Sequence, residues 1–392
     1  MSLSSSRSSQ VAARLETLAR RLGPGAKLPR LAELCRELGV SARTLDAALG
    51  ELENRGLIER RHAVGVFCTQ AVRERRRALR LALVCAPECF HSANHSPVWD
   101  SLLGLLRERA ARDGVEFDCF FSRTRPGLLQ AGVSDELTGA LLRGEFNAVL
   151  GLELPEAAAQ EIMACHLPLV SLFGKGHAVI GVDTTRQVQL GVEQLVEHGA
   201  RKVMLWQRIS PHAPQVSLRM QRFASEPFAE AIGSCEGEVQ SQGSLCVADV
   251  MDALNAPVEH PTQQGVRLAR QVFGRERASW PDGLLLADDL LARGALLTMR
   301  QLGVRVGRDV HVAVHANRHS PVLWGEERLI LVEVDPAELV DAMWCHLDRL
   351  LETGAGDEET EHLVAPYLAK LSVARGLEAP LPMFSSALAL ST

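Results

Sequence analysis

The chain has 392 residues, of which 46% are apolar and 23% charged. This length exceeds what one hydrophobic core usually supports, so two or three domains are expected, and the apolar content excludes a mainly disordered chain. Residues 1–80 carry 16 basic and 8 acidic side chains, a net charge of +8. Because the whole chain has a net charge of −6, the remaining residues carry −14. A basic head on an acidic body indicates a nucleic-acid-binding module joined to a second function. The alternative is an uneven surface charge without a partner.

No run of 18 apolar residues and no apolar N-terminal leader occurs, so we expect a cytoplasmic protein without a membrane span. The nine cysteines are an odd number without a CxxC pair, and we expect them to be reduced. The pairs His91/His95 and His315/His319 have the spacing of helical metal ligands, but no third ligand accompanies either pair. We therefore expect neither a metal nor a cofactor.

The head is patterned as three helices and a hairpin. Apolar residues recur at helical spacing in residues 10–22, 29–38 and 42–54. A helix-ending glycine and Ser41, a good N-cap, make the turn before the third helix short. A strand, a basic turn and a returning strand follow, up to Phe67. This order predicts a winged helix-turn-helix.

The head resembles the GntR-type winged-helix domain over about residues 10–70. The matching motifs are Gly25, Leu28-Pro29, Leu38-Gly39-Val40-Ser41, Gly56-Leu57-Ile58, Arg60-Arg61 and Gly65-x-Phe67. Three positions where the family usually holds arginine are occupied by Ala32, Ala42 and Asp46. An operator sequence therefore cannot be transferred from the family. Each lost phosphate contact would also reduce the slope of log DNA affinity against log salt concentration by about 0.9.

The candidate DNA contacts follow from the geometry of this fold, in which the third helix enters the major groove by its N-terminal end. They are Arg30, Ser41, Arg43, Thr44, Arg60, Arg61, His62 and Gly65. Arg43 is the best candidate for a base or phosphate contact, and the hydroxyls of Ser41 and Thr44 can donate to phosphate. For any one arginine the alternative is a solvated surface charge.

Residues 71–78 form a basic linker that contains Arg73, Arg75, Arg76 and Arg77. We favour a solvated tether over a segment that contacts the DNA backbone or minor groove. From Leu79 onward, apolar strand patterns and amphipathic helix patterns alternate, which predicts parallel sheets covered by helices on both faces. No GxGxxG, phosphate-binding loop or Gly-x-Ser-x-Gly interrupts them, so we do not expect an enzyme.

The body resembles the LacI-type effector domain, which is similar to periplasmic sugar-binding proteins, over about residues 79–375. The most specific match is the run PDGLLLADDLLARGALLTMRQLGVRVGRDVHVAV, residues 281–314. The resemblance implies two doubly wound α/β subdomains, joined by three crossovers, with a ligand in the cleft between them. The expected domains are a winged helix at 1–70, a linker at 71–78, an N-subdomain at 79–182 with 313–334, a C-subdomain at 183–312 with 335–378, and a flexible tail at 379–392.

The resemblance also assigns ligand-binding residues. They are Phe90, Trp99, Asp183, Arg222 (or Arg219 in another register), Asp289 and Asn317. Carboxylates, amides and arginine pair well with vicinal hydroxyls, and aromatic rings stack on sugar faces. The alternatives are a helix cap for Asp289, a turn for Asn317, and core or interface packing for Trp99.

Two departures from the family pattern leave the ligand class open. Asp288 stands where an asparagine is usual, and His315-Ala316-Asn317 replaces Gly-Phe-Asp. We expect a ligand-responsive bacterial transcription regulator, most simply a repressor, that binds a palindromic operator as a homodimer and answers to a sugar, polyol or nucleoside. The alternatives are a regulator whose altered cleft answers to a protein partner, a solute-binding protein and an enzyme.

Overall fold

The computed structural model describes a large part of the chain. The described residues are 11–12, 15–16, 18–19, 22, 25–61, 64–69, 79–90, 96–123, 132–209, 222–235, 239–246, 259–354 and 359–369. The chain divides into two compact units, the first made of Met1–Val182 with Asp335–Val364 and the second of Asp183–Val334 with Ala365–Thr392. No helix among the described residues is both long enough and apolar enough to span a membrane.

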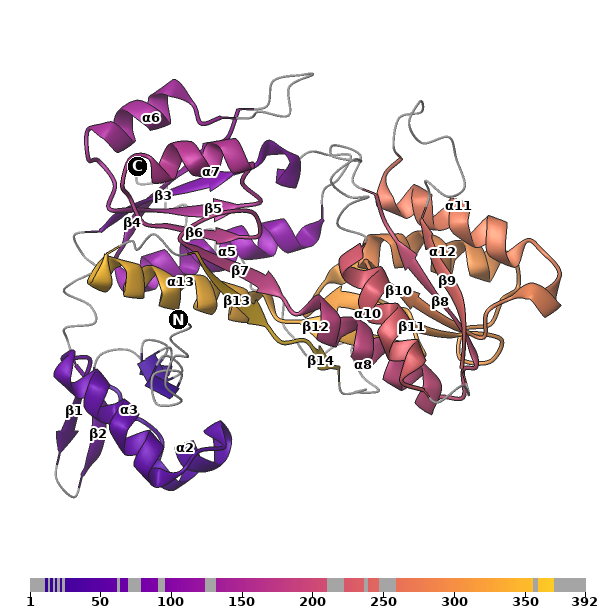
Figure 1. Cartoon of the computed structure of the whole chain (residues 1–392), viewed down its shortest axis with the longest axis horizontal. Helices are drawn as coiled ribbons and strands as arrows, with labels where there is room; N and C mark the ends of the chain where they lie inside the picture. The colour runs from indigo at the N-terminus through magenta and orange to yellow at the C-terminus, as the bar shows by residue number, and fades with distance from the viewer. Residues whose placement is uncertain are drawn as a thin grey trace, which may run out of the picture. The chain divides into compact units, whose positions relative to one another are not determined.

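The head of the first unit has the predicted order of helices and strands. Its elements are α2 (Leu31–Leu38), α3 (Ala42–Asn54), β1 (Ile58–Arg61) and β2 (Gly65–Cys68). The described residues between 11 and 22 are helical, and Leu15 packs with Leu34 and Leu49 in a separate small core. β1 and β2 pair antiparallel as a hairpin (Figure 1). The winged helix-turn-helix is confirmed.

Capping residues explain the tight turn before α3. Gly39 ends α2 with a φ of 63°, a left-handed conformation that glycine adopts without a steric cost. The Ser41 backbone is extended, and its Oγ accepts a hydrogen bond from the Thr44 amide at 3.2 Å. This cap lies two residues after Gly39, so α3 starts at Ala42, and the first turn of α3 is left on the surface.

The remainder of the first unit is a six-stranded parallel sheet covered on both faces. Its elements are β3 (Arg80–Cys85), η1 (Pro87–Phe90), α5 (Pro97–Asp113), β4 (Glu116–Phe121), α6 (Asp135–Leu142), β5 (Ala148–Leu152), α7 (Glu156–Met163), β6 (Leu169–Leu172), β7 (Ala178–Val182), α13 (Pro336–Thr353) and β13 (Thr360–Val364). The strand order is β13-β7-β6-β5-β3-β4. α6 and α7 cover one face, and α5 and α13 cover the other (Figure 1).

The second unit is built around another six-stranded sheet, ordered β14-β12-β11-β10-β8-β9. Its elements are α8 (Thr184–Glu197), β8 (Lys202–Gln207), α10 (Arg222–Gly233), β9 (Gln240–Cys246), α11 (Pro261–Phe273), η3 (Arg277–Ser279), β10 (Gly283–Leu286), α12 (Asp289–Gln301), β11 (His311–Asn317), η4 (Pro321–Leu323), β12 (Leu329–Val334) and β14 (Tyr367–Leu368). All pairs are parallel except β12 with β14.

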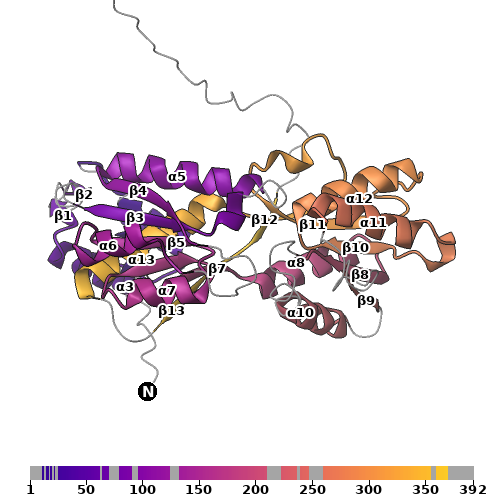
Figure 2. The same cartoon turned by 90° about the horizontal axis from the view of Figure 1, so that it is seen from above.

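Alternate residues of β10 serve the two faces of this sheet, as the pleat of a strand requires. Leu284 and Leu286 pack into the core under α11 and α12, whereas Leu285 packs into the core under α8 and α10. Figure 2 shows these two helix pairs on opposite sides of the strands. The prediction of parallel sheets with helices on both faces is confirmed.

The expected assignment of the C-terminal segments to subdomains is wrong. β11 and β12 extend the parallel ladder of β10, so residues 313–334 belong to the second unit. The chain then returns to the first unit, where α13 buries Trp344 and β13 pairs with β7. The strand and helix at 329–353 are not indicated by the sequence pattern described above. The three passages of the chain between the units agree with the three crossovers that the resemblance implies.

Candidate DNA-binding and ligand-binding sites

The first turn of α3 presents the residues expected to meet DNA. Ser41 and Arg43 are exposed and Thr44 is half-buried. The Oγ of Ser41 lies 2.9 Å from the Oγ1 of Thr44, so the two hydroxyls form one polar group at the helix N-terminus. Arg43 has no ion-pair partner among the residues described in the head. A helix N-terminus that carries two hydroxyls and an exposed arginine suits contact with phosphate and with guanine.

The wing carries a positive surface that includes a residue missed by the sequence analysis. Residues 25–28 run beside β2, and Lys27 forms an antiparallel bridge with Phe67. The Lys27 ammonium lies 5.9 Å from the centre of the Phe67 ring, and the Arg61 guanidinium lies 4.6 Å from it. Gly65 has a φ of 137°, and a Cβ there would meet the Lys27 stem. Sequence spacing had no signal for Lys27, because the bridge forms between segments 40 positions apart.

The remaining predicted DNA contacts differ in their surroundings. Arg30 is exposed at the start of α2, where its amide donates to the Glu33 carboxylate at 3.0 Å. Arg60 pairs with Asp46 and Glu53 of α3. His62 lies outside the described residues, as does the linker at 71–78.

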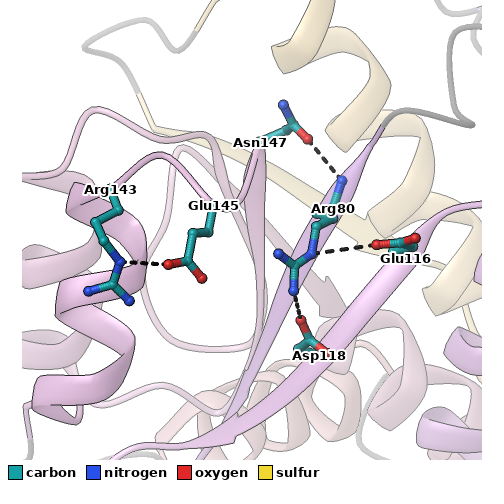
Figure 3. A network of polar contacts seen from close by, with 6 residues as sticks. All are labelled: Arg80, Glu116, Asp118, Arg143, Glu145 and Asn147. Carbon is teal, nitrogen blue, oxygen red and sulfur yellow. Dashed lines mark hydrogen bonds and ion pairs between the residues drawn. The ribbon is translucent and has the colours of Figure 1, made fainter.

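Arg80, which the sequence places at the end of the basic segment, belongs to the body. It is the first residue of β3, and its guanidinium pairs with Asp118 at 2.8 Å and with Glu116 at 3.6 Å (Figure 3). Its amide donates to the Asn147 side chain at 2.8 Å. Because these acidic side chains lie on the adjacent strand β4, the Arg80 charge is neutralised within the sheet.

A polar cluster lies at the carboxyl edge of the second unit's sheet. Arg208 follows β8, Asp288 and Asp289 follow β10, and Ser320 follows β11. Parallel strands bring these carboxyl ends to one edge, which is where ligands of open α/β sheets bind. The Arg208 Nε lies 2.8 Å from the Asp288 Oδ2.

Asp288 and Asp289 have different roles, although they are adjacent. Asp288 is the N-cap of α12, since its Oδ1 accepts from the Leu291 amide at 2.9 Å. The alternative that Asp289 is only a helix cap is therefore wrong. Asp289 is 4% exposed and accepts a hydrogen bond from the Ser320 hydroxyl at 2.8 Å. Burial first, and then the charge of Asp288, raises the pKa of Asp289 to about 6.

Two further residues lie next to this cluster, and one of them, Gln264, fixes the backbone of the residue after Arg208. Gln264 is fully buried, and its amide accepts from the Ile209 N–H at 2.9 Å and donates to the Ile209 carbonyl at 2.7 Å. His260 caps α11, and burial lowers its pKa, with opposing effects from Asp288 and Arg208. Arg208 directly follows an apolar strand, which is a usable sequence signal. Gln264, His260 and Ser320 had no such signal, because they reach the site through loop and helix geometry.

The other predicted ligand residues are distributed over both units. Asp183 is the N-cap of α8, and Asn317 ends β11 opposite Val334. Arg222 begins α10, and its side chain lies outside the described part, as does Arg219.

In the first unit, Phe90 packs edge-to-face on Phe121 with ring centres 5.9 Å apart. Trp99 of α5 is 7% exposed. The buried position of Trp99 agrees with the packing alternative, because a ring must have a free face to stack on a sugar.

Comparisons with known proteins support this two-part organisation. Residues 7–68 match the family model described as bacterial regulatory proteins, gntR family, and residues 192–371 match the periplasmic binding protein-like domain. No curated protein sequence is significantly similar to the chain.

Three solved structures are similar in fold. The transcriptional regulator CelR–cellobiose complex is 19% identical with a TM-score of 0.54, covering 88% of this chain and 99% of that chain. A regulatory protein of the LacI family from Chloroflexus aggregans is 16% identical with a TM-score of 0.56, covering 74% and 96%. The lac repressor dimer bound to operator and the anti-inducer ONPF is 14% identical with a TM-score of 0.54, covering 77% and 95%. Both resemblances inferred from the sequence are confirmed.

Proposed function

Because the chain joins a gntR-family domain to a periplasmic binding protein-like domain, we propose that it is a ligand-responsive transcription regulator, most simply a repressor. The observation that carries the proposal is the polar cluster of Arg208, Asp288, Asp289 and Ser320 at the carboxyl edge of a sheet, in the same chain as a winged helix. Such an edge binds small molecules in open α/β folds.

The DNA-binding half of the proposal rests on α3 and the wing. Arg43 reads a base, Ser41 and Thr44 meet phosphate, and Arg61 with Lys27 brings positive charge to the flanking backbone. Two copies of the chain place two such helices on a palindromic operator, because the symmetry of a dimer matches that of the DNA. The structure of a lac repressor dimer on its operator supports this arrangement by analogy of fold.

The effector is a small polyhydroxylated molecule of the sugar, polyol or nucleoside class. Asp289 accepts from one hydroxyl of the effector, and Arg208 donates to another. Asp183, Asn317 and Arg222 of the second unit and Phe90 of the first remain candidate contacts, whereas the burial of Trp99 favours a packing role. Effector binding changes DNA affinity by about 1–3 kcal/mol, and DNA changes effector affinity by the same amount.

The test measures DNA and effector binding on the same variants. The full chain is titrated onto the duplex upstream of its own gene at low salt, and its melting temperature is followed across a panel of sugars, polyols and nucleosides. Arg43→Ala is expected to lose specific DNA binding and keep the effector-induced shift. Asp289→Ala is expected to bind DNA without responding to the effector.

Matched controls remove equal charges elsewhere. Arg186→Ala and Glu193→Gln on the exposed surface of α8 should leave both activities unchanged. Absence of DNA binding by the wild type, or equal loss of both activities in Arg43→Ala and Asp289→Ala, would contradict the proposal. DNA binding with no response to any small molecule would favour a protein partner as the signal.

A further inference from the structure

The pairing of Arg60 with α3 has a consequence for how the head discriminates between DNA sequences. We propose that Asp46 and Glu53 hold the Arg60 guanidinium against α3, so that Arg60 positions the wing and does not contact phosphate. Asp46 thereby restrains the sequence-independent attraction of the head for DNA. This inference rests on the proposed DNA-binding function and deepens it.

Arg60 is engaged through three hydrogen bonds and one further ion-pair contact. Its Nη1 lies 2.6 Å from the Asp46 Oδ1, and its Nη2 donates to the Asp46 carbonyl at 2.9 Å. Its Nε lies 3.1 Å from the Glu53 Oε2, and its backbone amide donates to the Glu53 Oε1 at 3.2 Å. All three kinds of guanidinium nitrogen are therefore directed toward α3, and a phosphate would have to displace them.

Gly50 lies next to this arrangement. A Cβ built at Gly50 would lie 3.7 Å from the Arg60 Nη2, an ordinary van der Waals contact, so the guanidinium lies close to the backbone of α3 at this position. Its Nη2 also donates to the Asp46 backbone carbonyl. The contact with a backbone acceptor distinguishes this clamp from a casual pair of surface charges, which contributes little by itself.

The other cations of the head are held differently. Arg61 stacks on Phe67, and its side chain is 53% exposed, compared with 33% for Arg60. Arg43 lies one helical turn before Asp46, so the two side chains are neighbours on the surface of α3. The Asp46 carboxylate is 72% exposed and lies on the helix that would enter the groove, where an unneutralised negative charge repels phosphate. The ion pair with Arg60 neutralises the Asp46 charge, and it also keeps the Arg60 guanidinium away from DNA phosphates.

The restraint matters because sequence-independent attraction competes with specific binding. Counterion release makes non-specific affinity depend on the number of phosphates neutralised, with about 0.9 in the logarithmic salt slope for each contact. A protein that keeps one arginine off the phosphates loses non-specific affinity at every site, and its specificity ratio rises if the operator contacts are made by other residues. Asp46 is in this sense a specificity-determining residue.

The test is a set of salt titrations on a duplex of mixed sequence about 30 base pairs long, using the full chain between about 50 and 200 mM salt. Asp46→Asn keeps the size of the side chain and weakens the clamp. Asp46→Asn is expected to steepen the slope of log affinity against log salt concentration by up to about 0.9. Between the lowest and the highest salt, the variant would then lose roughly threefold more affinity than the wild type loses. Arg60→Met is expected to leave the slope unchanged, because Arg60 makes no phosphate contact in the wild type.

Two further variants separate release of Arg60 from a general change in charge. Glu51→Gln removes one negative charge from the same helix and should steepen the slope less than Asp46→Asn. The double variant Asp46→Asn with Arg60→Met should return to the wild-type slope, since the released guanidinium is absent. Circular dichroism melting of each variant checks that the head remains folded.

The outcomes are distinct. A fall of about one in the slope for Arg60→Met would show a phosphate contact and overturn the clamp while leaving the regulator function intact. An equal effect of Asp46→Asn and Glu51→Gln, or a persistent gain in the double variant, would also overturn it. If the wild type binds no DNA at low salt, the proposed function fails, and this inference fails with it.

Discussion

The hydroxyl of Ser320 donates a hydrogen bond to the buried carboxyl of Asp289, with 2.8 Å between Oγ and Oδ2. The two residues are 31 positions apart, and the bond fastens the segment after β11 to the first turn of α12. A carboxylate in this position is surrounded by little water, lies beside the charge of Asp288, and accepts hydrogen bonds from the Ser320 hydroxyl and the Leu290 amide. Its ionisation is therefore coupled to folding and to what occupies the site.

Asp289 is expected to make stability depend on pH. Its pKa is raised to about 6 in the folded protein, so the folded state holds the proton more tightly than the unfolded chain. The resulting stabilisation is present below about pH 4 and is lost as the pH rises through about 6. Asp289→Asn cannot ionise, so it should be more stable than the wild type above pH 6, by roughly 1–3 kcal/mol, with a smaller difference near pH 4. Urea unfolding at both ends of this range measures it.

Replacement of an exposed carboxylate serves as the comparison for Asp289. Glu193→Gln on α8 is the comparison variant, because the Glu193 side chain is about half exposed. A constant difference between Asp289→Asn and the wild type at all pH values would contradict the assignment of a raised pKa to Asp289.

Buried His315 is expected to make the folded protein less stable at acid pH, which is the opposite of the effect of Asp289. Burial lowers the pKa of His315 to about 4, so the unfolded chain binds a proton at a higher pH than the folded protein does. Stability is therefore retained at neutral pH and is lost as the pH falls from about 6.5 toward 4, by at most roughly 3 kcal/mol. His315→Gln should lose less stability over this interval than the wild type. Replacement of the exposed His319 by Gln is the matched control, and an identical acid response in both variants would refute the prediction.

A buried ion-pair network is expected to hold α13 to α5. The Arg109 guanidinium lies 3.0 Å from the Asp113 carboxylate and 2.5 Å from that of Asp341, and it also lies over the Trp344 ring. Asp341→Ala leaves the buried cation with less compensation and should lower the free energy of unfolding by about 2–4 kcal/mol. Glu193→Ala, which breaks an exposed pair with Arg186, should cost less than about 1 kcal/mol. Equal costs in chemical denaturation would show that burial adds nothing to the network.

Two glycines allow α11 and α12 to pack with their backbones in contact. A Cβ at Gly294 would overlap the Thr262 carbonyl, and one at Gly265 would overlap the Leu291 carbonyl. Gly294→Ala should therefore destabilise the protein by about 1–3 kcal/mol, because backbone must shift to admit the methyl group. Gly104→Ala in α5 meets no atom within 4 Å and should instead stabilise by about 0.5–1 kcal/mol. Thermal unfolding of both variants checks the sign, and a gain for Gly294→Ala would contradict the close packing.

Local patterns in the chain indicated the order of elements from the head to β11. The apolar runs at β3 and β10 and the cap at Ser41 depend on neighbours within a few positions, so periodicity and capping chemistry identify them. The two family resemblances rest on motifs of the same short range. Asp289 was selected in this way, and its burial beside Ser320 agrees with a site at the end of a strand.

The remaining features depend on which surfaces meet after folding. Residues 313–334 belong to the second unit and α13 belongs to the first, the reverse of the expectation. Strand pairing with β10 decides the first assignment, and burial against the first unit's sheet decides the second. Arg60 is paired with α3, and Lys27 is brought to the wing, by contacts over 14 and 40 positions. Hydrogen bonds and ion pairs of this kind form between groups that lie a few ångströms apart in space. The number of residues between two groups along the chain therefore does not show whether they will pair.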